Sequence, residues 1–375
     1  MRIPRTLAIV LAGGKGSRLG SLTDHTVKPA LPFAGTYRLI DISLSNLAHS
    51  HLSDVWIAEQ YLPHSLNEHL AQGRPWDLDR LHGGLQFLAP FEGAVGEGMA
   101  HGNSDTLWRH KERIRSFGAD HVLVLSADQA YTCDFLDVLN THTSSDADLT
   151  IVSTRVDEDP SSYSVLQVDD EGRVTGFAYK PDEPQGNLVA AEVFAYRAQA
   201  LLDALDELGG EKGGLGDYGE DLLPHFVETR RVVEHHLEGY WRDLGTIDAY
   251  WRAHMELLDG CGPVLDDPAW PIWTAQPQLL PARIEATAEV TDSMVASGSR
   301  VAGAVTHAVV GPGVVVEEGA TVIDSVVLDG VHVGPGVELV RCVVAPGARV
   351  TGGSRRGSED AVTLIGADGT ISDRA

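Results

Sequence analysis

Apolar residues recur at every sixth position in the last third of the chain. One series runs Val310, Val316, Val322 and Leu328, and a second runs Val314, Ala320 and Val326. Pro-Gly or Glu-Gly pairs lie between them, at 312–313, 318–319 and 335–336. A six-residue period with small turn residues is typical of a parallel β-helix, in which each hexapeptide forms one face of a coil. We therefore expect a β-helix over residues 281–353. The alternative is a β-sandwich with valine-rich strands, which rarely keeps so strict a period.

The first 260 residues follow a different pattern, in which short apolar runs alternate with helical spacing. Residues 6–11 (TLAIVL) and 121–128 (HVLVLSAD) are typical of buried parallel strands. Ile40, Leu44 and Leu47 recur at helical spacing, and a helix is expected over 105–117 before Gly118. Strands that alternate with helices predict an α/β fold with an open, mostly parallel, Rossmann-like sheet. Ligands of such sheets bind at the carboxyl ends of the strands.

Length and composition divide the chain and exclude several functions. The 375 residues are expected to form a catalytic domain (1–260), a linker rich in Pro and Trp (261–280), the β-helix (281–353) and a loose polar tail (354–375). Lys plus Arg number 28 and Asp plus Glu number 54, giving a net charge of −26, which argues against nucleic-acid binding. Three distant cysteines argue against a disulfide scaffold or a zinc site. Without a signal peptide or a long apolar segment, a cytoplasmic location and no membrane partner are expected.

A glycine-rich loop directly follows the first strand and is the strongest local signal. Its residues are Gly13, Gly14, Lys15, Gly16, Ser17 and Arg18. Consecutive glycines let backbone N–H groups approach phosphate oxygens, and the two cationic side chains add positive charge. The loop lacks the GxxxxGK[ST] pattern of a P-loop, and Leu19 stands where the dinucleotide motif GxGxxG needs its last glycine. Taken alone, a glycine-rich turn after a strand is weak evidence, and a purely structural turn is the alternative.

The wider sequence around this loop resembles a known enzyme family. The run LAGGKGSRLGSLTDHTVKPALPFAGTYRLIDISLSN, residues 11–46, is similar to the N-terminal signature of the sugar-nucleotide pyrophosphorylases, and most similar to that of the bacterial glucose-1-phosphate adenylyltransferases. Residues 60–69, 215–224 and 240–251 (YWRDLGTIDAYW) resemble further motifs of that family in the same order. The resemblance covers roughly residues 6 to 350.

This resemblance implies a fold, a reaction and an assembly. The fold is a nucleotidyltransferase sheet followed by a left-handed β-helix. The reaction transfers a nucleotidyl group from a nucleoside triphosphate, ATP in that family, to α-D-glucose 1-phosphate, giving ADP-glucose and pyrophosphate for glycogen or α-glucan synthesis. The relatives are homotetramers. Because several negative charges must meet, catalysis is expected to rest on positioning, on Lys and Arg, and on a divalent cation, Mg²⁺, held by carboxylates.

The resemblance also assigns roles to individual residues. Asp128 and Asp243 match the two metal ligands of the family, although either could instead cap a turn. Arg18, Lys28 and Asp128 are the expected catalytic residues. The expected nucleotide-binding residues are Gly13, Gly14, Lys15, Gly16, Ser17, Arg18, Gly102 and Asp105, the last of which could equally be an acid in the first turn of a helix. Lys180, with Tyr179 and Asp217, is expected at the sugar phosphate, with a lysine on a solvated turn as the alternative.

The sequence departs from the family at positions that contact the sugar and the base. The EKP motif is Tyr179-Lys180-Pro181, SMGxYxF is residues 190–196 (AAEVFAY), and GDH is residues 127–129 (ADQ). PAQQR is replaced at 89–93, and WYRGTAD at 99–105. Two explanations follow: an active enzyme with a changed sugar or base, or a weakly active or regulatory subunit that pairs with a related chain. The retained phosphate and metal residues favour activity.

The β-helix suggests two further functions. Hexapeptide β-helices occur in acyltransferases, for which His307 or His332 would be available, but the catalytic signature lies in the N-terminal region. An anionic effector, as in the resembling family, would have Arg300, Arg341 and Arg349 available. Assembly and regulation are therefore the expected roles of this part of the chain.

Overall fold

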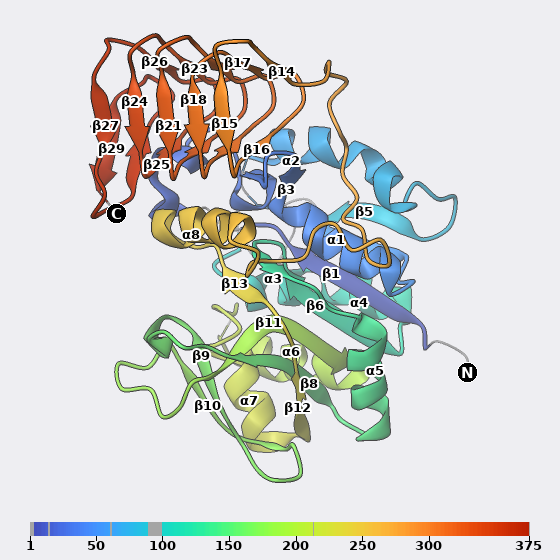
Figure 1. The fold of residues 1–375 in the computed structure, drawn as a ribbon. Coiled ribbons are helices and arrows are strands. Elements are labelled where there is room, and N and C mark those ends of the chain that lie inside the picture. Colours follow the sequence, from blue (N-terminus) through green and yellow to red (C-terminus); the bar gives the residue numbers. More distant parts are fainter. Residues whose placement is uncertain (1–3, 14–15, 61, 89–99, 213, 375) are drawn as a thin grey trace.

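The computed structural model describes residues 4–374, apart from 14–15, 61, 89–99 and 213. Figure 1 shows an α/β region in blue to yellow and a stack of short strands in orange to red. None of the described helices is long and apolar enough to cross a membrane.

A mixed sheet of nine strands organises the described part of the N-terminal region. Its main path is β10-β9-β11-β6-β1-β4-β5, and β8 pairs with both β11 and β12. The strands are β1 (Thr6–Leu11), β4 (Asp54–Ala58), β5 (Gly84–Leu88), β6 (His121–Ser126), β8 (Leu149–Arg155), β9 (Ser164–Val168), β10 (Val174–Tyr179), β11 (Leu188–Arg197) and β12 (Val232–His236). The pairs among β5, β4, β1 and β6 are parallel, as expected, whereas β11 runs antiparallel to β6.

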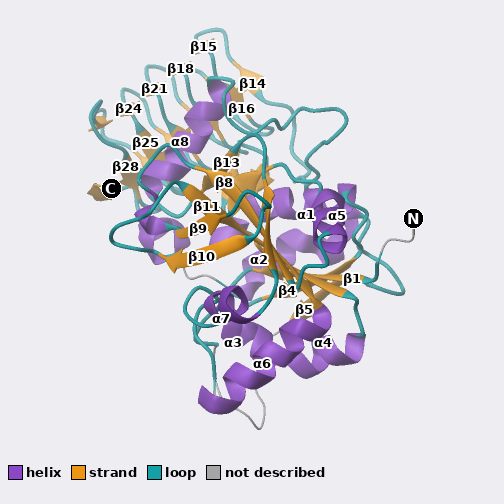
Figure 2. Cartoon of the chain, turned by 90° about the horizontal axis from the view of Figure 1, so that it is seen from below, coloured by secondary structure: helices purple, strands orange, loops and turns teal. Residues whose placement is uncertain are grey.

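Helices cover both faces of this sheet (Figure 2). They are α1 (Leu39–His49), α2 (Pro63–Leu70), α3 (Asn103–Arg109), α4 (Lys111–Phe117), α5 (Phe135–Ser144), α6 (Ala198–Lys212), α7 (Leu222–Thr229) and α8 (Ile247–Leu258). Alternate residues of β1 face opposite sides: Leu7 and Ile9 pack with α3, α6 and α7, while Ala8 and Val10 pack with α1, α2 and α5. The helix expected over 105–117 is instead two helices that meet at His110, and Gly118 ends the second in a left-handed conformation.

Shorter elements lie between these helices and strands along the chain. They are η1 (Ser17–Thr23), η2 (Lys28–Ala30), β2 (Pro32–Phe33), β3 (Tyr37–Arg38), η3 (Ala71–Trp76), β7 (Gln129–Tyr131), η4 (Pro160–Ser162) and β13 (Trp241–Asp243). β13 pairs antiparallel with β7, which directly follows β6. This pairing brings the segment near residue 243 to the carboxyl end of β6.

The six-residue period forms a parallel β-helix, as expected. Three parallel stacks run β14-β17-β20-β23-β26, β15-β18-β21-β24-β27 and β16-β19-β22-β25-β28, and β29 pairs antiparallel with β28. All members of the two predicted apolar series are buried. The strands are β14 (Arg283–Ile284), β15 (Glu289–Thr291), β16 (Met294–Val295), β17 (Arg300–Val301), β18 (Ala304–Thr306), β19 (Val309–Val310), β20 (Val315–Val316), β21 (Thr321–Ile323), β22 (Val326–Val327), β23 (His332–Val333), β24 (Glu338–Val340), β25 (Cys342–Val344), β26 (Arg349–Val350), β27 (Arg355–Gly357), β28 (Thr363–Ile365) and β29 (Ile371–Arg374).

The segment after residue 353 differs from the loose tail expected from its polar composition. It contributes β27, β28 and β29 to the stacks. Val362, Leu364 and Ile365 are buried, so a few apolar residues suffice to hold this segment against the β-helix. The linker 261–280 has no helix or strand, and the rings of Trp270 and Trp273 pack on His49 of α1.

The β-helix packs against α8, which follows β13 in the chain (Figure 1). The indole N–H of Trp251 donates to the carbonyl of Asp324 at 2.6 Å, and the guanidinium of Arg341 lies 4.2 Å from the Trp251 ring centroid. Arg38 pairs with Asp329 at 2.7 Å. The β-helix therefore braces α8 from the side opposite the sheet.

A buried histidine in α8 makes stability depend on pH. His254 is fully buried; its Nε2 accepts from the backbone N–H of Ala34 at 3.1 Å, and its Nδ1 lies 2.8 Å from the carbonyl of Tyr250. Burial lowers the pKa of His254 from 6.5 to about 4. The unfolded chain therefore binds more protons between pH 6.5 and 4, and the free energy of unfolding should fall by about 3 kcal/mol across that range.

We expect His254→Gln, which can still donate and accept a hydrogen bond, to lose this part of the acid sensitivity. Urea unfolding at pH 7 and pH 4.5 would measure it. The exposed His82→Gln is the matched control, since its change should leave the pH dependence as in the wild type. Equal pH slopes for the wild type and His254→Gln would contradict the assignment.

Candidate active site

Two carboxylates and one ammonium converge at the carboxyl end of β6. Nζ of Lys28 lies 2.8 Å from Oδ2 of Asp128 and 2.9 Å from Oδ1 of Asp243. The Lys28 side chain is only 5 % exposed, whereas those of Asp128 and Asp243 are 25 % and 20 % exposed. Residues separated by as many as 215 positions thus meet at the sheet edge where ligands of parallel strands bind.

Local structure explains how each of these side chains is placed. Asp128 lies between β6 and β7, and the hydroxyl of Ser126 donates to its carboxylate. Asp243 is the last residue of β13, opposite Gln129 in the antiparallel β13–β7 pair. Lys28 begins the short helix η2, where Pro29 follows it.

The charges of this group support one another. Burial opposes the charge of Lys28, but the carboxylates of Asp128 and Asp243 outweigh it and raise the pKa of the ammonium. Burial also opposes ionisation of Asp128, yet the Lys28 ammonium lowers the pKa of that carboxyl below its usual value. Lys28 and Asp128 therefore carry opposite charges near neutral pH, and each stabilises the charge of the other.

The glycine-rich loop lies beside this group. Gly16 is left-handed (φ 62°) and leads into η1, which carries Arg18. A Cβ on Gly245 would lie 2.7 Å from Oδ2 of Asp243 and 2.9 Å from Nη2 of Arg18, so both side chains press against the backbone of Gly245. Arg18 and Asp243 line the same cavity, of about 300 Å³. Gly14 and Lys15 are outside the described residues, as are the departures at 89–93 and at residue 99.

A second cluster holds the residues expected at the sugar phosphate. The hydroxyl of Tyr179 donates to Oδ2 of Asp217 at 2.7 Å, and Nζ of Lys180 donates to the same hydroxyl at 2.9 Å. Lys180 is exposed, and its backbone is left-handed (φ 44°) just before Pro181. The structure thus brings Asp217 to Tyr179 and Lys180, which lie 38 and 37 residues before it in the sequence.

Known proteins resemble the chain along nearly its whole length. A family model described as "Nucleotidyl transferase" matches residues 7–260, and one described as "GlmU-like, C-terminal hexapeptide" matches 278–363. The glucose-1-phosphate adenylyltransferase of Bacillus cytotoxicus is 34 % identical over 96 % of this chain and 97 % of its own. Those of Acetivibrio thermocellus and Bacillus thuringiensis are 34 % and 35 % identical, over 94 % and 91 % of this chain and 83 % and 91 % of their own.

The chain belongs to the glucose-1-phosphate adenylyltransferase family. It is accordingly a nucleotidyltransferase, and enzymes of this family generally use a divalent metal. The resemblance stated from its motifs and the α/β plus β-helix fold are both confirmed.

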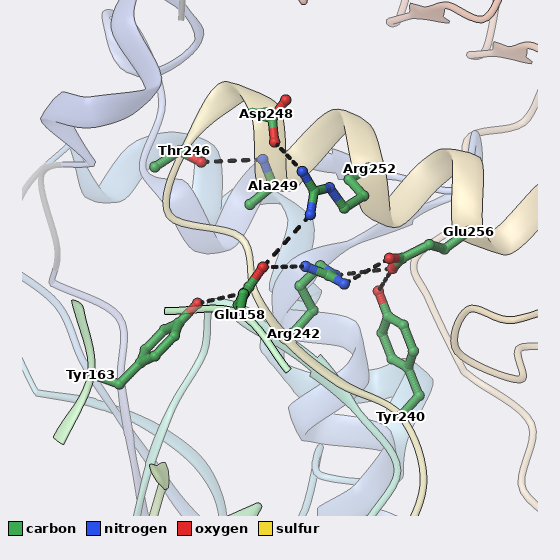
Figure 3. Close-up of polar contacts among 9 residues, drawn as sticks. All are labelled: Glu158, Tyr163, Tyr240, Arg242, Thr246, Asp248, Ala249, Arg252 and Glu256. Atoms are coloured by element: carbon green, nitrogen blue, oxygen red, sulfur yellow. Dashed lines mark hydrogen bonds and ion pairs between the residues drawn. The ribbon is translucent and has the colours of Figure 1, made fainter. Parts of the chain in front are cut away.

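An arginine network in this family member fixes the strand that carries Asp243 (Figure 3). Arg242 donates through Nε and Nη2 to Glu256 of α8 at 2.9 and 2.6 Å, and Tyr240 donates to the same carboxylate at 2.8 Å. Glu158 lies 3.6 Å from both Arg242 and Arg252, between the two guanidinium groups. The Arg242–Glu256 pair, whose side chains are 17 % and 20 % exposed, joins β13 to α8.

Gly102 is half-buried and Asp105 is buried. A Cβ on Gly102 would lie 2.4 Å from the backbone of Gly216, so glycine is needed here for close chain packing. Asp105 is 1 % exposed and accepts from the backbone of His101, from Nε of Arg109 at 2.8 Å and from the backbone of Leu215. Of the two roles weighed for Asp105, these contacts favour the first-turn acid; nucleotide contact by either residue stays a prediction.

The β-helix histidines and arginines are largely engaged within the chain. His307 lies between Asp324 (2.7 Å) and Asp259 (3.3 Å), and His332 pairs with Glu317 at 3.2 Å. Arg300 pairs with Glu285 and Glu317. These contacts tie coils to each other and to the end of α8, so they support a structural role for the β-helix.

Sequence reasoning did not name Glu192 as a site residue. It lies in β11, and its carboxylate interacts electrostatically with both Asp128 and Asp243. Burial, followed by these two carboxylates, raises the pKa of Glu192 to about 7. The signal was present in the sequence, because Glu192 stands at the glycine of the family's SMGxYxF motif.

Proposed function

We propose that this protein transfers the adenylyl group of ATP to α-D-glucose 1-phosphate, releasing pyrophosphate and forming ADP-glucose for α-glucan synthesis. The observation that supports this most strongly is the convergence of Lys28, Asp128 and Asp243 beside Arg18. Attack of a sugar-phosphate oxygen on the α-phosphorus brings several anions together, and an array of fixed cations and metal-binding carboxylates is what that reaction needs.

Each cluster has a part in this proposal. Arg18 and the backbone of the glycine-rich loop, residues 13–18, bind the triphosphate. The guanidinium of Arg18 supplies positive charge close to Asp243. Lys28 stands between the two acids and neutralises charge on the reacting phosphates. Lys180 binds the acceptor's phosphate, while Tyr179 and Asp217 line the sugar side. The chain thus orients two anionic substrates and lowers their mutual repulsion.

Asp128 and Asp243 fit a divalent cation, which we propose to be Mg²⁺. The two carboxylates already converge on one cationic group, the Lys28 ammonium. No cluster of three or more His, Cys, Asp or Glu suited to a metal occurs among the described residues, so phosphate oxygens and water would complete the coordination, as Mg²⁺ prefers. When bound, the ion would neutralise charge on the phosphates.

We further propose a homotetramer in the cytoplasm, following the resembling family. Size-exclusion chromatography with light scattering would test the assembly, and a monomer at working concentration would refute it. A hetero-oligomer with a related chain is the alternative that goes with a regulatory role.

The function is tested by measuring pyrophosphate release for each pair of nucleoside triphosphate and sugar 1-phosphate, with and without Mg²⁺. The proposal expects the highest kcat/KM with ATP and α-D-glucose 1-phosphate. A better rate with another sugar or base would identify a pyrophosphorylase of changed specificity. No turnover with any pair, together with a changed response of a catalytic relative on mixing, would identify a regulatory subunit.

Arg18→Ala should raise the KM for the triphosphate roughly tenfold, because one charge-assisted contact to phosphate is lost while Lys28 and the loop backbone stay. The KM for the sugar phosphate should change little. Steady-state kinetics with each substrate varied in turn measures both. Arg74→Ala is the control, since the Arg74 side chain is 80 % exposed and pairs only with Asp79 among the described contacts. An unchanged triphosphate KM would exclude Arg18 from the site.

A further inference from the structure

Glu192 has a backbone conformation that side-chain-bearing residues rarely adopt. Its φ is +51°, and the pairing of β11 with β8 shifts register between Ala190 and Phe194. A β-bulge of this kind redirects a side chain. Left-handed backbone at a non-glycine residue is costly, persists only where the surrounding structure enforces it, and concentrates at functional sites. Glycine at this position would adopt the same conformation without strain. The presence of a glutamate therefore points to a role for its side chain.

The carboxylate of Glu192 is close to groups at both clusters of the active site. The next residue, Val193, pairs with Leu125 near the end of β6, and that strand leads to Asp128. On the other side, the carboxylate of Glu192 is close enough to the hydroxyl of Tyr218 to add to the effect of burial and raise the pKa of that hydroxyl. Tyr218 follows Asp217, which holds the hydroxyl of Tyr179 at 2.7 Å. Glu192 therefore lies near the residue that directly follows Asp217 of the cluster at Lys180.

Two other uses of this carboxylate are not favoured. Glu192 does not complete a metal site with Asp128 and Asp243, because the described residues hold no such group of three acids. Glu192 also does not replace Asp217 as the partner of these groups, because the two carboxylate oxygens of Asp217 already accept from the hydroxyl of Tyr179 and from the backbone N–H of Tyr218. A carboxylate can accept about four hydrogen bonds, so Glu192 has capacity beyond its interaction with Tyr218.

We propose that Glu192 is a specificity-determining residue that accepts a hydrogen bond from the acceptor sugar. This inference rests on the proposed function, since it assumes that a sugar 1-phosphate lies between Lys180 and the Asp128–Asp243 pair. The donor on the sugar is a hydroxyl or an ammonium group. A half-buried carboxylate disfavours an acceptor without the donor, because one of its hydrogen-bond positions is then left unfilled.

The test compares acceptors with ATP and Mg²⁺ in the wild type, Glu192→Gln and Glu192→Gly. The acceptors are α-D-glucose 1-phosphate, its 2-, 3-, 4- and 6-deoxy analogues and α-D-glucosamine 1-phosphate. We expect the wild type to lose tenfold or more in kcat/KM with at least one deoxy analogue. In Glu192→Gly, kcat/KM for glucose 1-phosphate should fall about tenfold. The deoxy analogue that the wild type disfavours should then react as well as glucose 1-phosphate. The KM for ATP should change less than twofold.

Glu192→Gln distinguishes the two donors. If the donor is a hydroxyl, the amide oxygen retains most of the discrimination. If the donor is an ammonium, the wild type prefers α-D-glucosamine 1-phosphate, and Glu192→Gln loses that preference about tenfold, because the bond is no longer charge-assisted. Glu171→Gln, in the exposed turn between β9 and β10, is the control and should behave as the wild type.

Folding is checked separately. Glu192→Gly relieves the left-handed strain, so its Tm should equal or exceed that of the wild type even though discrimination falls. If the wild type is active and Glu192→Gly discriminates between the acceptors as strongly as the wild type does, this inference is overturned and the proposed function stays intact. No turnover by the wild type with any acceptor would overturn the proposed function, and this inference with it.

Discussion

Asp128→Asn and Asp243→Asn should each lower kcat by about 100-fold or more. Either change removes one of the two carboxylates that converge on Lys28, at nearly constant volume, and with it a charge that a hard divalent cation needs. Losses of this size are typical when one group that stabilises developing charge is removed. Pyrophosphate release at saturating substrates measures kcat, and a titration with Mg²⁺ should show a raised half-saturating concentration for both variants.

The fold should survive these changes, because Lys28 keeps one carboxylate partner in each variant. Asp170→Asn, at an exposed turn position, is the matched control and should retain wild-type kcat. Thermal unfolding separates the catalytic effect from misfolding. Full activity of Asp128→Asn with an unchanged Mg²⁺ dependence would exclude the metal assignment.

Lys180→Gln should raise the KM for the sugar 1-phosphate roughly 30- to 100-fold and leave kcat nearly unchanged. The ammonium is exposed and lies 4.6 Å from the centroid of the Tyr179 ring, and we propose that it contacts the phosphate equally in the ground state and the transition state. A contact of equal strength in both states appears in KM and not in kcat. The KM for ATP should change little.

The same variant separates an enzyme from a regulatory subunit. Lys111→Gln is the control, because Lys111 pairs with Asp206 on the surface and such pairs contribute little. Two results together would favour the regulatory-subunit hypothesis over the enzyme hypothesis. The purified protein would show only a trace of turnover that Lys180→Gln leaves unchanged, and mixing it with a catalytic relative would change the response of that relative to effectors.

The strongest sequence patterns predicted the parts of the fold that depend on local chemistry. The hexapeptide period predicted the β-helix because a coil face holds a fixed number of residues, and its apolar positions are all buried. The apolar run at residues 6–11 predicted a buried parallel strand, since both faces of β1 pack against helices. The prediction of a loose tail after residue 353 was wrong because most of this segment is polar, whereas three buried apolar residues, Val362, Leu364 and Ile365, fix its position.

The sequence by itself determined which residue types are available for phosphate chemistry: the glycine-rich loop, Lys28, the two aspartates and Lys180. Motifs identify these residues because each chemical role needs a particular side chain. Only the tertiary structure decided which of these residues lie next to each other in space. Asp128 and Asp243 share one ammonium because β13 pairs with β7, a long-range pairing that neither segment encodes alone. Glu192 reaches the site for a similar reason: a register shift in β11 redirects its side chain, and register depends on the neighbouring strands.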